Sequence, residues 1–335
     1  MALAIEYRVD DRSILLPYYK KHLIEPALRY LPASLHPNTI THAGHLINLL
    51  GAAVLLALWP TRGWPFVFAA VTLHLYVWCD NVDGAHARRT KQASPLGEFL
   101  DHGLDQVNMV YIAIITAMAL GVSPFWWVVH LLLIPGAGCL AYLEQTQTGV
   151  LRMGLLNQVE SIVVLGFVLL ASAIFGNEAF ERVTFHGYSL RLVLCLWSTS
   201  TILFGIVRGM VRTASFGGAR ANAPALPFVI LGVAIFASWR VEAISTINAA
   251  TLATCSNVYF GMRMLSRRLR EKPAKVEPLL IVSALVLLLC AALRAAGHSI
   301  APWVGTLIAI AACAAFGLET VRAARSGIQH VVGNS

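Results

Sequence analysis

Long runs without a charged residue are the feature that most limits how this chain can fold. The runs are residues 40–61, 63–79, 106–143, 161–177, 192–207, 221–239, 243–262, 278–293 and 295–318. A helix needs about 20 apolar residues to cross the hydrocarbon core of a bilayer. The 106–143 run is nearly twice that length, and Gly121 and Pro124 divide it in two. The sequence therefore predicts an all-α polytopic membrane protein with about ten transmembrane helices.

The composition excludes an ordinary soluble fold. Charged residues make up 13% of the 335 residues and apolar residues 57%, whereas a soluble domain contains about 25% charged residues. The net charge of +8 fits Lys and Arg side chains that face anionic lipid headgroups. We therefore expect a bilayer, and no nucleic acid, as the partner of these basic residues.

The distribution of Lys and Arg predicts an orientation. If ten helices cross the membrane, the loops on the side of the N-terminus carry 20 of the 25 basic residues. Basic loops stay on the cytoplasmic side of a membrane. Both termini are therefore predicted to be cytoplasmic, in the endoplasmic reticulum or Golgi membrane of a eukaryote or in the inner membrane of a bacterium.

Residues 1–36 precede the first predicted membrane helix and combine apolar and basic side chains. Ile14, Leu15 and Leu16 are followed by Lys20 and Lys21. This mixture is typical of an amphipathic helix that lies in the cytoplasmic interface, and a soluble tail is the alternative. The first forty residues lack the uninterrupted apolar core of a cleavable signal peptide.

Four of the six aspartates gather where carboxylates are costly. Asp80 and Asp83 are three residues apart at the end of the second predicted helix, and Asp101 and Asp105 are four residues apart at the start of the third. Each spacing places two carboxylates on one face of a helix. Acids at the ends of membrane helices are usually paired or functional.

The chemistry of this acidic cluster favours a hard divalent cation. Four carboxylates repel one another unless cations lie between them, and oxygen ligands suit Mg²⁺ or Mn²⁺. Two such ions would clamp a reacting phosphoryl group, and Arg88 could hold a phosphate oxygen. The alternative is a set of salt bridges from the four aspartates to Arg88, Arg89 and Lys91.

The residues around the aspartates resemble a known signature. The chain contains Asp80-Asn-Val-Asp83-Gly84-Ala-His-Ala-Arg88, eight further residues, and Gly97-Glu-Phe-Leu-Asp101-His-Gly-Leu-Asp105. This pattern is similar to the D-x2-D-G-x2-A-R-x8-G-x3-D-x3-D signature of the CDP-alcohol phosphotransferases, and all eight fixed positions match. A motif of this length is specific, unlike a lone glycine pattern.

Other segments resemble the choline/ethanolamine phosphotransferase branch of that family. They are Tyr7 with 11–13, 37–41 with Gly44, 87–90, 94–98, 101–103, and 146–154 with Glu160. The resemblance thus covers residues 7–160. Ala85 and His86 replace a Lys-Gln pair that is usual in the branch, which leaves metal binding intact but opens the question of the head group.

The resemblance implies an activity and a division of the chain. Such enzymes transfer a phosphoalcohol from CDP-choline or CDP-ethanolamine to the hydroxyl of diacylglycerol and release CMP. The resemblance also implies a catalytic core at 37–160, further transmembrane helices at 161–320 that provide the acceptor site or a homodimer scaffold, and a cytoplasmic tail at 321–335.

The resemblance implies roles for residues of the signature and for Asn38, and Glu160 is either a residue that orients the acceptor or a helix-end acid in water. Asp80, Asp83, Asp101 and Asp105 would hold two Mg²⁺ or Mn²⁺ ions. Substrate would be bound by Asn38, Gly84, Arg88 and Glu160. His102 is the favoured base for the acceptor hydroxyl, and Asp105 is its rival for that role.

Two other functions remain open on the sequence alone. The same signature serves enzymes that transfer a phosphatidyl group from CDP-diacylglycerol to a soluble alcohol, although these usually have about six membrane helices. A ten-helix transporter is the alternative of a different class. A transporter would carry ionisable residues near the bilayer midplane, whereas these acids lie at predicted helix ends.

Overall fold

The computed structural model describes residues 8–59, 62–154, 157–299 and 301–332. Within them the chain divides into two compact units. We call the unit with residues 9–122 and 152–200 the motif unit, and the one with 123–151 and 201 onward the second unit. Tyr7, the final residues of the predicted tail and part of residues 1–36 lie outside the described residues.

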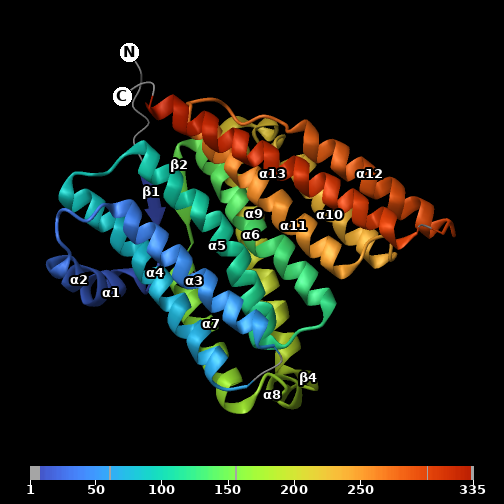
Figure 1. The fold of residues 1–335 in the computed structure, drawn as a ribbon, viewed down its shortest axis with the longest axis horizontal. Coiled ribbons are helices and arrows are strands. Elements are labelled where there is room, and N and C mark those ends of the chain that lie inside the picture. Colours follow the sequence, from blue (N-terminus) through green and yellow to red (C-terminus); the bar gives the residue numbers. More distant parts are fainter. Residues whose placement is uncertain (1–7, 60–61, 155–156, 300, 333–335) are drawn as a thin grey trace. The chain divides into compact units, whose positions relative to one another are not determined.

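The motif unit contains the N-terminal segment and four long helices (Figure 1). Its elements are β1 (Arg8–Asp11), α1 (Leu16–Tyr19), the π-helical turn η1 (Lys20–Ile24), α2 (Glu25–Tyr30), α3 (Pro37–Ala57), α4 (Trp64–Thr90), α5 (Pro95–Leu120), α7 (Gln158–Phe175), α8 (Ala179–Arg182), β3 (Thr184–Phe185) and β4 (Tyr188–Ser189). Strands β3 and β4 pair antiparallel. Strand β2 (Val150–Met153) and α9 (Leu190–Gly217) each run from one unit into the other.

The second unit is helical in its described part. Its helices are α6 (Pro124–Thr148), the 3₁₀ turn η2 (Ala219–Asn222), α10 (Ala225–Arg240), α11 (Thr246–Leu269), α12 (Pro278–Ala295) and α13 (Pro302–Val332). Helix α11 packs against α6 and α13, and α10 packs against α12. Helix α13 continues through the described part of the predicted tail.

The described helices support the predicted membrane protein. Helices α3, α5, α6, α7, α9, α12 and α13 are long and apolar enough to cross a membrane, and α10 is a shorter apolar helix. Helices α4 and α11 coincide with the two remaining predicted spans, but each carries charged residues in its last turn. The chain is thus an all-α polytopic membrane protein, while a count of ten crossings stays a prediction.

Proline and glycine determine where the long helices begin and end. Helices α3, α5 and α6 each have proline in the first turn, where its missing N–H costs nothing. Gly121 adopts a left-handed conformation with φ of 60° and ends α5, because its N–H and that of Val122 bond to the carbonyls of the last turn. The predicted break inside residues 106–143 is confirmed.

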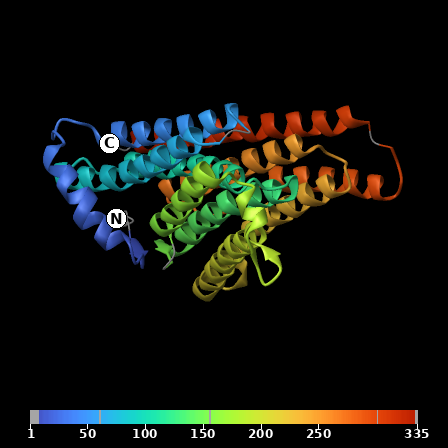
Figure 2. The same ribbon diagram turned by 90° about the horizontal axis from the view of Figure 1, so that it is seen from below.

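In the motif unit, α3 packs against both α4 and α5, and α7 packs against α4. Helix α3 approaches α4 closely at Gly44, where an added Cβ would lie 2.7 Å from the Cβ of Cys79. The N-terminal segment lies beside the end of α4 that carries the motif, as Figure 2 shows. These contacts bring the start of α3, the end of α4 and the start of α5 together.

The N-terminal segment is helical over residues 16–30, as the sequence predicts. It packs on the motif unit through Leu16 and Ile24, which are buried, while Tyr18, Leu23 and Tyr30 are exposed. The indole of Trp78 donates a hydrogen bond to the carbonyl of Leu23. The location of this segment at the membrane surface stays a prediction.

The second unit contains a buried ion pair between α6 and α9. The carboxylate of Glu144, whose side chain is 3% exposed, accepts two hydrogen bonds of 2.7 Å from the guanidinium of Arg212. This bidentate geometry compensates the cost of burying the charge of Glu144.

Candidate active site

The motif lies on two helices that are joined by the four residues 91–94. Asp80 and Asp83 belong to the last three turns of α4, and Asp101 and Asp105 to the second and third turns of α5. Lys91 ends α4 in a left-handed conformation with φ of 59°, and the Ser94 hydroxyl caps α5 by accepting a hydrogen bond from the backbone N–H of Gly97. A polar first turn thus precedes the apolar run, and Asp101 and Asp105 lie near the start of this helix, where the sequence predicts them.

Three of the four motif aspartates converge. One carboxylate oxygen from each of Asp80, Asp101 and Asp105 lies within 4.8 Å of the others. The Oδ1 atom of Asp101 is buried and has no hydrogen-bond partner among the described residues. A buried carboxylate oxygen without a donor, next to two further carboxylates, is the environment that a hard cation stabilises. The residues present therefore fit a divalent metal ion.

The predicted salt-bridge alternative has no support in the described part of the chain. The ion pairs there involve other acids, and none includes Asp80, Asp101 or Asp105. The guanidinium of Arg89 instead donates to the carbonyl of Leu31. Among the described residues, Asp80, Asp101 and Asp105 therefore form no ion pair with Arg88, Arg89 or Lys91.

Asp83 occupies a different position from the other three. Its Oδ2 accepts a hydrogen bond of 2.5 Å from the hydroxyl of Thr41 on α3, and its Oδ1 accepts one from the backbone N–H of Gly84. Its side chain is thus oriented by α3 as well as by its own helix. The structure brings Asp83 to the edge of the cluster, and its role as a metal ligand stays a prediction.

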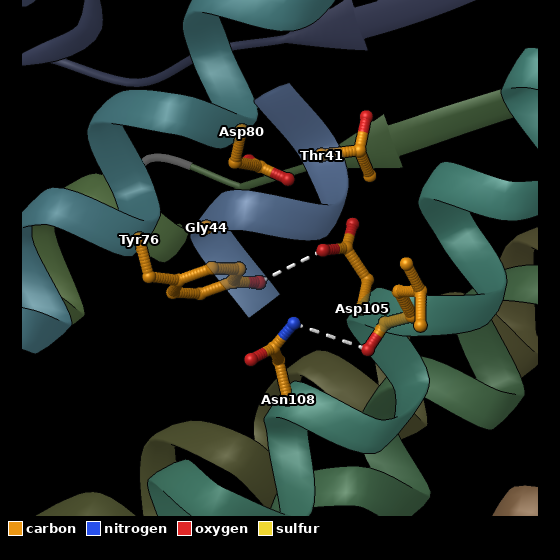
Figure 3. Close-up of a pocket in the computed structure, with 7 residues that line it drawn as sticks. Thr41, Gly44, Tyr76, Asp80, Asp105 and Asn108 are labelled. Atoms are coloured by element: carbon orange, nitrogen blue, oxygen red, sulfur yellow. Dashed lines mark hydrogen bonds between the residues drawn. The ribbon is translucent and has the colours of Figure 1, made fainter. Parts of the chain in front are cut away.

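A small hollow adjoins the cluster, and Figure 3 shows how side chains from α3, α4 and α5 meet around it. Its lining residues are Thr41, Gly44, Tyr76, Asp80, Leu104, Asp105 and Asn108. Asn108 accepts a hydrogen bond from the amide of Asn48 and donates one to the Leu104 carbonyl. Beyond the hollow, the bundle therefore continues as a buried polar layer.

The predicted substrate-binding residues lie on three helices around the motif. Arg88 is exposed, and its guanidinium lies over Gly84, where an added Cβ would be 3.4 Å from Nη1. The Oδ1 atom of Asn38, on the first turn of α3, lies 3.4 Å from the position that a Cβ on Gly97 would occupy. The two motif glycines thus leave room beside an arginine and an asparagine.

His102 and Glu160 are both buried, with 5% and 7% of their surface exposed. His102 follows the cluster residue Asp101 on α5. The Oε1 atom of Glu160 accepts hydrogen bonds from the Ser13 hydroxyl at 2.6 Å and the Leu15 N–H at 2.8 Å. Its Oε2 accepts one of 3.1 Å from the N–H of Asn157, which caps α7.

Tyr76 precedes the motif, where the sequence offers either a cage for a quaternary ammonium or an ordinary interfacial aromatic residue. An aromatic residue just before the motif is expected at the membrane interface, but Tyr76 is 3% exposed. Its hydroxyl donates a hydrogen bond of 2.8 Å to Oδ1 of Asp105. Tyr76 lies one helical turn before Asp80, and this spacing places both residues on the same face of α4. The spacing alone does not predict the contact of Tyr76 with Asp105 on α5.

His86, one of the two departures from the branch pattern, points away from the cluster. It is fully buried, and its Nε2 lies 2.8 Å from the carbonyl oxygen of Leu35. Its Nδ1 contacts the guanidinium of Arg89. The side chain of His86 therefore anchors the segment before α3, and it does not line the hollow.

The acidic cluster affects the pKa of Tyr19 in the N-terminal segment. Burial and the nearby carboxylate of Asp80 raise the pKa of Tyr19 to about 12. The phenol is therefore neutral at physiological pH and adds no negative charge to the acidic cluster.

Comparison with known proteins agrees with this geometry. The model of the CDP-alcohol phosphatidyltransferase family matches residues 34–204, which include every motif residue. Cholinephosphotransferase 1 of Xenopus laevis is 30% identical over 224 residues, which are 63% of this chain and 52% of that protein. Cholinephosphotransferase 1 of Gallus gallus is 33% identical over 200 residues, or 55% of this chain and 57% of that protein.

A third relative carries a family name without an assigned activity. It is an uncharacterized CDP-alcohol phosphatidyltransferase class-I family protein of Dictyostelium discoideum, 30% identical over 178 residues, or 51% of this chain and 44% of that protein. The chain spans about half the length of the curated relatives it matches. Because the family model covers half of the chain and all of the converging aspartates, the chain belongs to the CDP-alcohol phosphatidyltransferase family.

Proposed function

We propose that this protein transfers phosphocholine or phosphoethanolamine from a CDP-alcohol to the hydroxyl of diacylglycerol. The observation that carries the proposal is the convergence of Asp80, Asp101 and Asp105 within the family signature. The relatives named cholinephosphotransferase support a CDP-alcohol as the nucleotide substrate. In the reaction the acceptor oxygen forms a bond to the phosphorus of the phosphoalcohol, and the phosphoanhydride bond to CMP breaks. CMP leaves with the electron pair of that bond.

The four motif aspartates are proposed to hold two Mg²⁺ or Mn²⁺ ions. Bound ions of this kind neutralise the diphosphate and stabilise the charge that develops at phosphorus. Asp80, Asp101 and Asp105 provide the core of the site, and Thr41 holds the carboxylate of Asp83 by a hydrogen bond. The exposed guanidinium of Arg88 is free to hold phosphate oxygens beside Gly84.

The acceptor hydroxyl must lose its proton as it attacks. His102 is proposed as the base, because a neutral imidazole accepts a proton near physiological pH and because it follows Asp101 on the same helix. Asp105 is the alternative base. Its Oδ1 already accepts a hydrogen bond from Tyr76, which favours a ligand role for Asp105.

Asn38 and Glu160 are the two remaining residues that are proposed to bind substrate. Asn38, on the first turn of α3 beside Gly97, is proposed to contact the nucleotide. Glu160 is proposed to orient the acceptor. Its carboxylate accepts hydrogen bonds from Ser13, Leu15 and Asn157, which fix its orientation at the start of α7.

The placement of the enzyme in the cell is also a proposal. A soluble CDP-alcohol must meet a membrane lipid at the cytoplasmic face, which agrees with the charge-based prediction that this face carries the basic loops. Both termini are proposed to be cytoplasmic and the protein to be a homodimer. Crosslinking of the purified protein in lipid would test the dimer.

A panel of substrates tests the reaction. Purified protein in lipid nanodiscs would be incubated with CDP-choline, CDP-ethanolamine or CDP-diacylglycerol, with and without diacylglycerol and soluble alcohols. We expect CMP release from the first two only with diacylglycerol and Mg²⁺ or Mn²⁺. Turnover of CDP-diacylglycerol with a soluble alcohol, and none with CDP-choline or CDP-ethanolamine, would replace the proposed reaction with the alternative one.

Two substitutions test the proposed roles. Asp101→Asn should abolish CMP release while the protein stays folded, and Asp10→Asn is the matched control because Asp10 forms an exposed pair with Arg12 away from the cluster. His102→Ala should lower the rate by a factor of about 10² to 10⁴ with little change in CDP-alcohol binding. A nearly normal rate for that variant would transfer the base role to Asp105.

A further inference from the structure

Asp105 is held by a chain of side chains that reaches back to α7. Tyr76 on α4 donates a hydrogen bond of 2.8 Å to Oδ1 of Asp105, and Gln158 on α7 donates one of 3.2 Å from Nε2 to the Tyr76 hydroxyl (Figure 3 shows the first). Because the amide supplies a hydrogen to the phenol oxygen, the phenol hydrogen is directed to the carboxylate. The hydroxyl therefore has a fixed orientation.

The first turn of α7, which carries Gln158, is itself anchored. Asn157 caps this turn, and its amide donates a hydrogen bond of 2.7 Å to Oδ1 of Asp11. Glu160 in the same turn binds Ser13 and Leu15. The first turn of α7 thus joins two sets of hydrogen bonds: Asn157 and Glu160 bind the N-terminal segment, and the adjacent Gln158 begins the relay to Asp105.

We propose that Tyr76 is a positioning residue that fixes Asp105 as a metal ligand, and that Gln158 acts on Asp105 only through Tyr76. The bond to Oδ1 stops rotation of the carboxylate and leaves Oδ2 as the oxygen for a cation shared with Asp80 and Asp101. The proposal rests on the proposed function, because it needs the metal site. Groups that orient metal ligands typically change metal affinity by 10- to 100-fold when they are removed.

The test measures metal binding without turnover. Full-length protein in nanodiscs would be titrated with Mn²⁺, and electron paramagnetic resonance would report free Mn²⁺. Tyr76→Phe keeps the ring and removes the hydroxyl, and we expect it to weaken Mn²⁺ binding about tenfold. Gln158→Ala should weaken it by a few-fold, because the direct bond from Tyr76 to Asp105 remains.

A double variant separates positioning from a general loss of structure. If Gln158 acts through the hydroxyl, the variant Tyr76→Phe/Gln158→Ala should bind Mn²⁺ as Tyr76→Phe does. Tyr111→Phe is the matched control, since Tyr111 also lies on a long helix of the motif unit and its ring contacts His45. Its Mn²⁺ affinity should equal that of the wild type.

The outcomes distinguish the two proposals. Unchanged Mn²⁺ affinity in Tyr76→Phe, or additive losses in the double variant, would overturn the positioning role. If Tyr76→Phe does not fold, Gln158→Ala alone decides, and unchanged affinity in it overturns the relay. Wild-type protein that binds Mn²⁺ no better than Asp101→Asn would instead overturn the metal site and with it the proposed function.

Discussion

The three hydrogen bonds at Glu160 allow a quantitative prediction for the N-terminal segment. In Glu160→Gln the side chain keeps its shape but has one acceptor oxygen. That oxygen will take the position of Oε1, where two donors meet, so that the amide nitrogen faces the N–H of Asn157. The substitution thus weakens two hydrogen bonds and removes the third.

The size of the effect follows from the charge on the acceptor. A hydrogen bond to a charged group contributes about 1.5–3 kcal/mol and a neutral one about 0.5–1.5 kcal/mol. Each bond at Oε1 therefore weakens by about 1 kcal/mol, whereas the bond to Asn157 lies within α7 and does not hold the N-terminal segment. The sum of about 2 kcal/mol for the two bonds at Oε1 corresponds to about 30-fold easier local opening.

Amide hydrogen exchange measures this opening directly, because the Leu15 N–H is bonded to Glu160. In nanodiscs, exchange at Leu15 should become about 30-fold faster in Glu160→Gln. Glu178→Gln is the control, since Glu178 pairs with Arg62 at an exposed site, and it should leave Leu15 unchanged. Equal exchange of Leu15 in Glu160→Gln and wild type would show that apolar packing of Leu16, and not this carboxylate, holds the segment.

Three further changes have defined outcomes. Removal of divalent ions with a chelator should stop CMP release, and Mg²⁺ or Mn²⁺ should restore it; undiminished turnover in the chelator would refute the metal requirement. Gly44→Ala should destabilise the protein by about 1–3 kcal/mol, because the new Cβ would lie 2.7 Å from that of Cys79, whereas Gly205→Ala, with open space around it, should not lower Tm. Arg212→Met should cost about 2–3 kcal/mol by removing the guanidinium from the buried Glu144 carboxylate, less than for a fully buried pair because the Arg212 side chain is 33% exposed. Thermal unfolding of Arg212→Met with and without Glu144→Gln checks this, and no recovery of Tm in the double variant would contradict it.

The sequence predicts the features of this protein that depend on local patterns. Apolar runs give the membrane helices, because hydrocarbon tolerates only helices with satisfied backbones, and Gly121 marks the end of α5. The spacing of the signature predicts a carboxylate cluster, and Asp80, Asp101 and Asp105 do converge. Helical periodicity is sufficient for these results.

Contacts between distant segments were not predictable in this way. Asp83 bonds to Thr41, 42 residues away, and Glu160 bonds to Ser13, 147 residues away. Such pairs depend on which helix faces pack together, and one sequence does not specify that packing. For the same reason Tyr76 was expected at the interface although it is buried against Asp105.

The short connection of residues 91–94 gives the spacing of the signature an angular meaning. The eight residues between Arg88 and Gly97 comprise the end of α4, this connection and the start of α5. One residue inserted within either helix would rotate everything beyond it by about 100° and turn Asp101 and Asp105 away from Asp80. The fixed gap in the signature therefore keeps the aspartate-bearing faces of α4 and α5 turned towards each other. Only insertions within the four connecting residues can leave these faces in place.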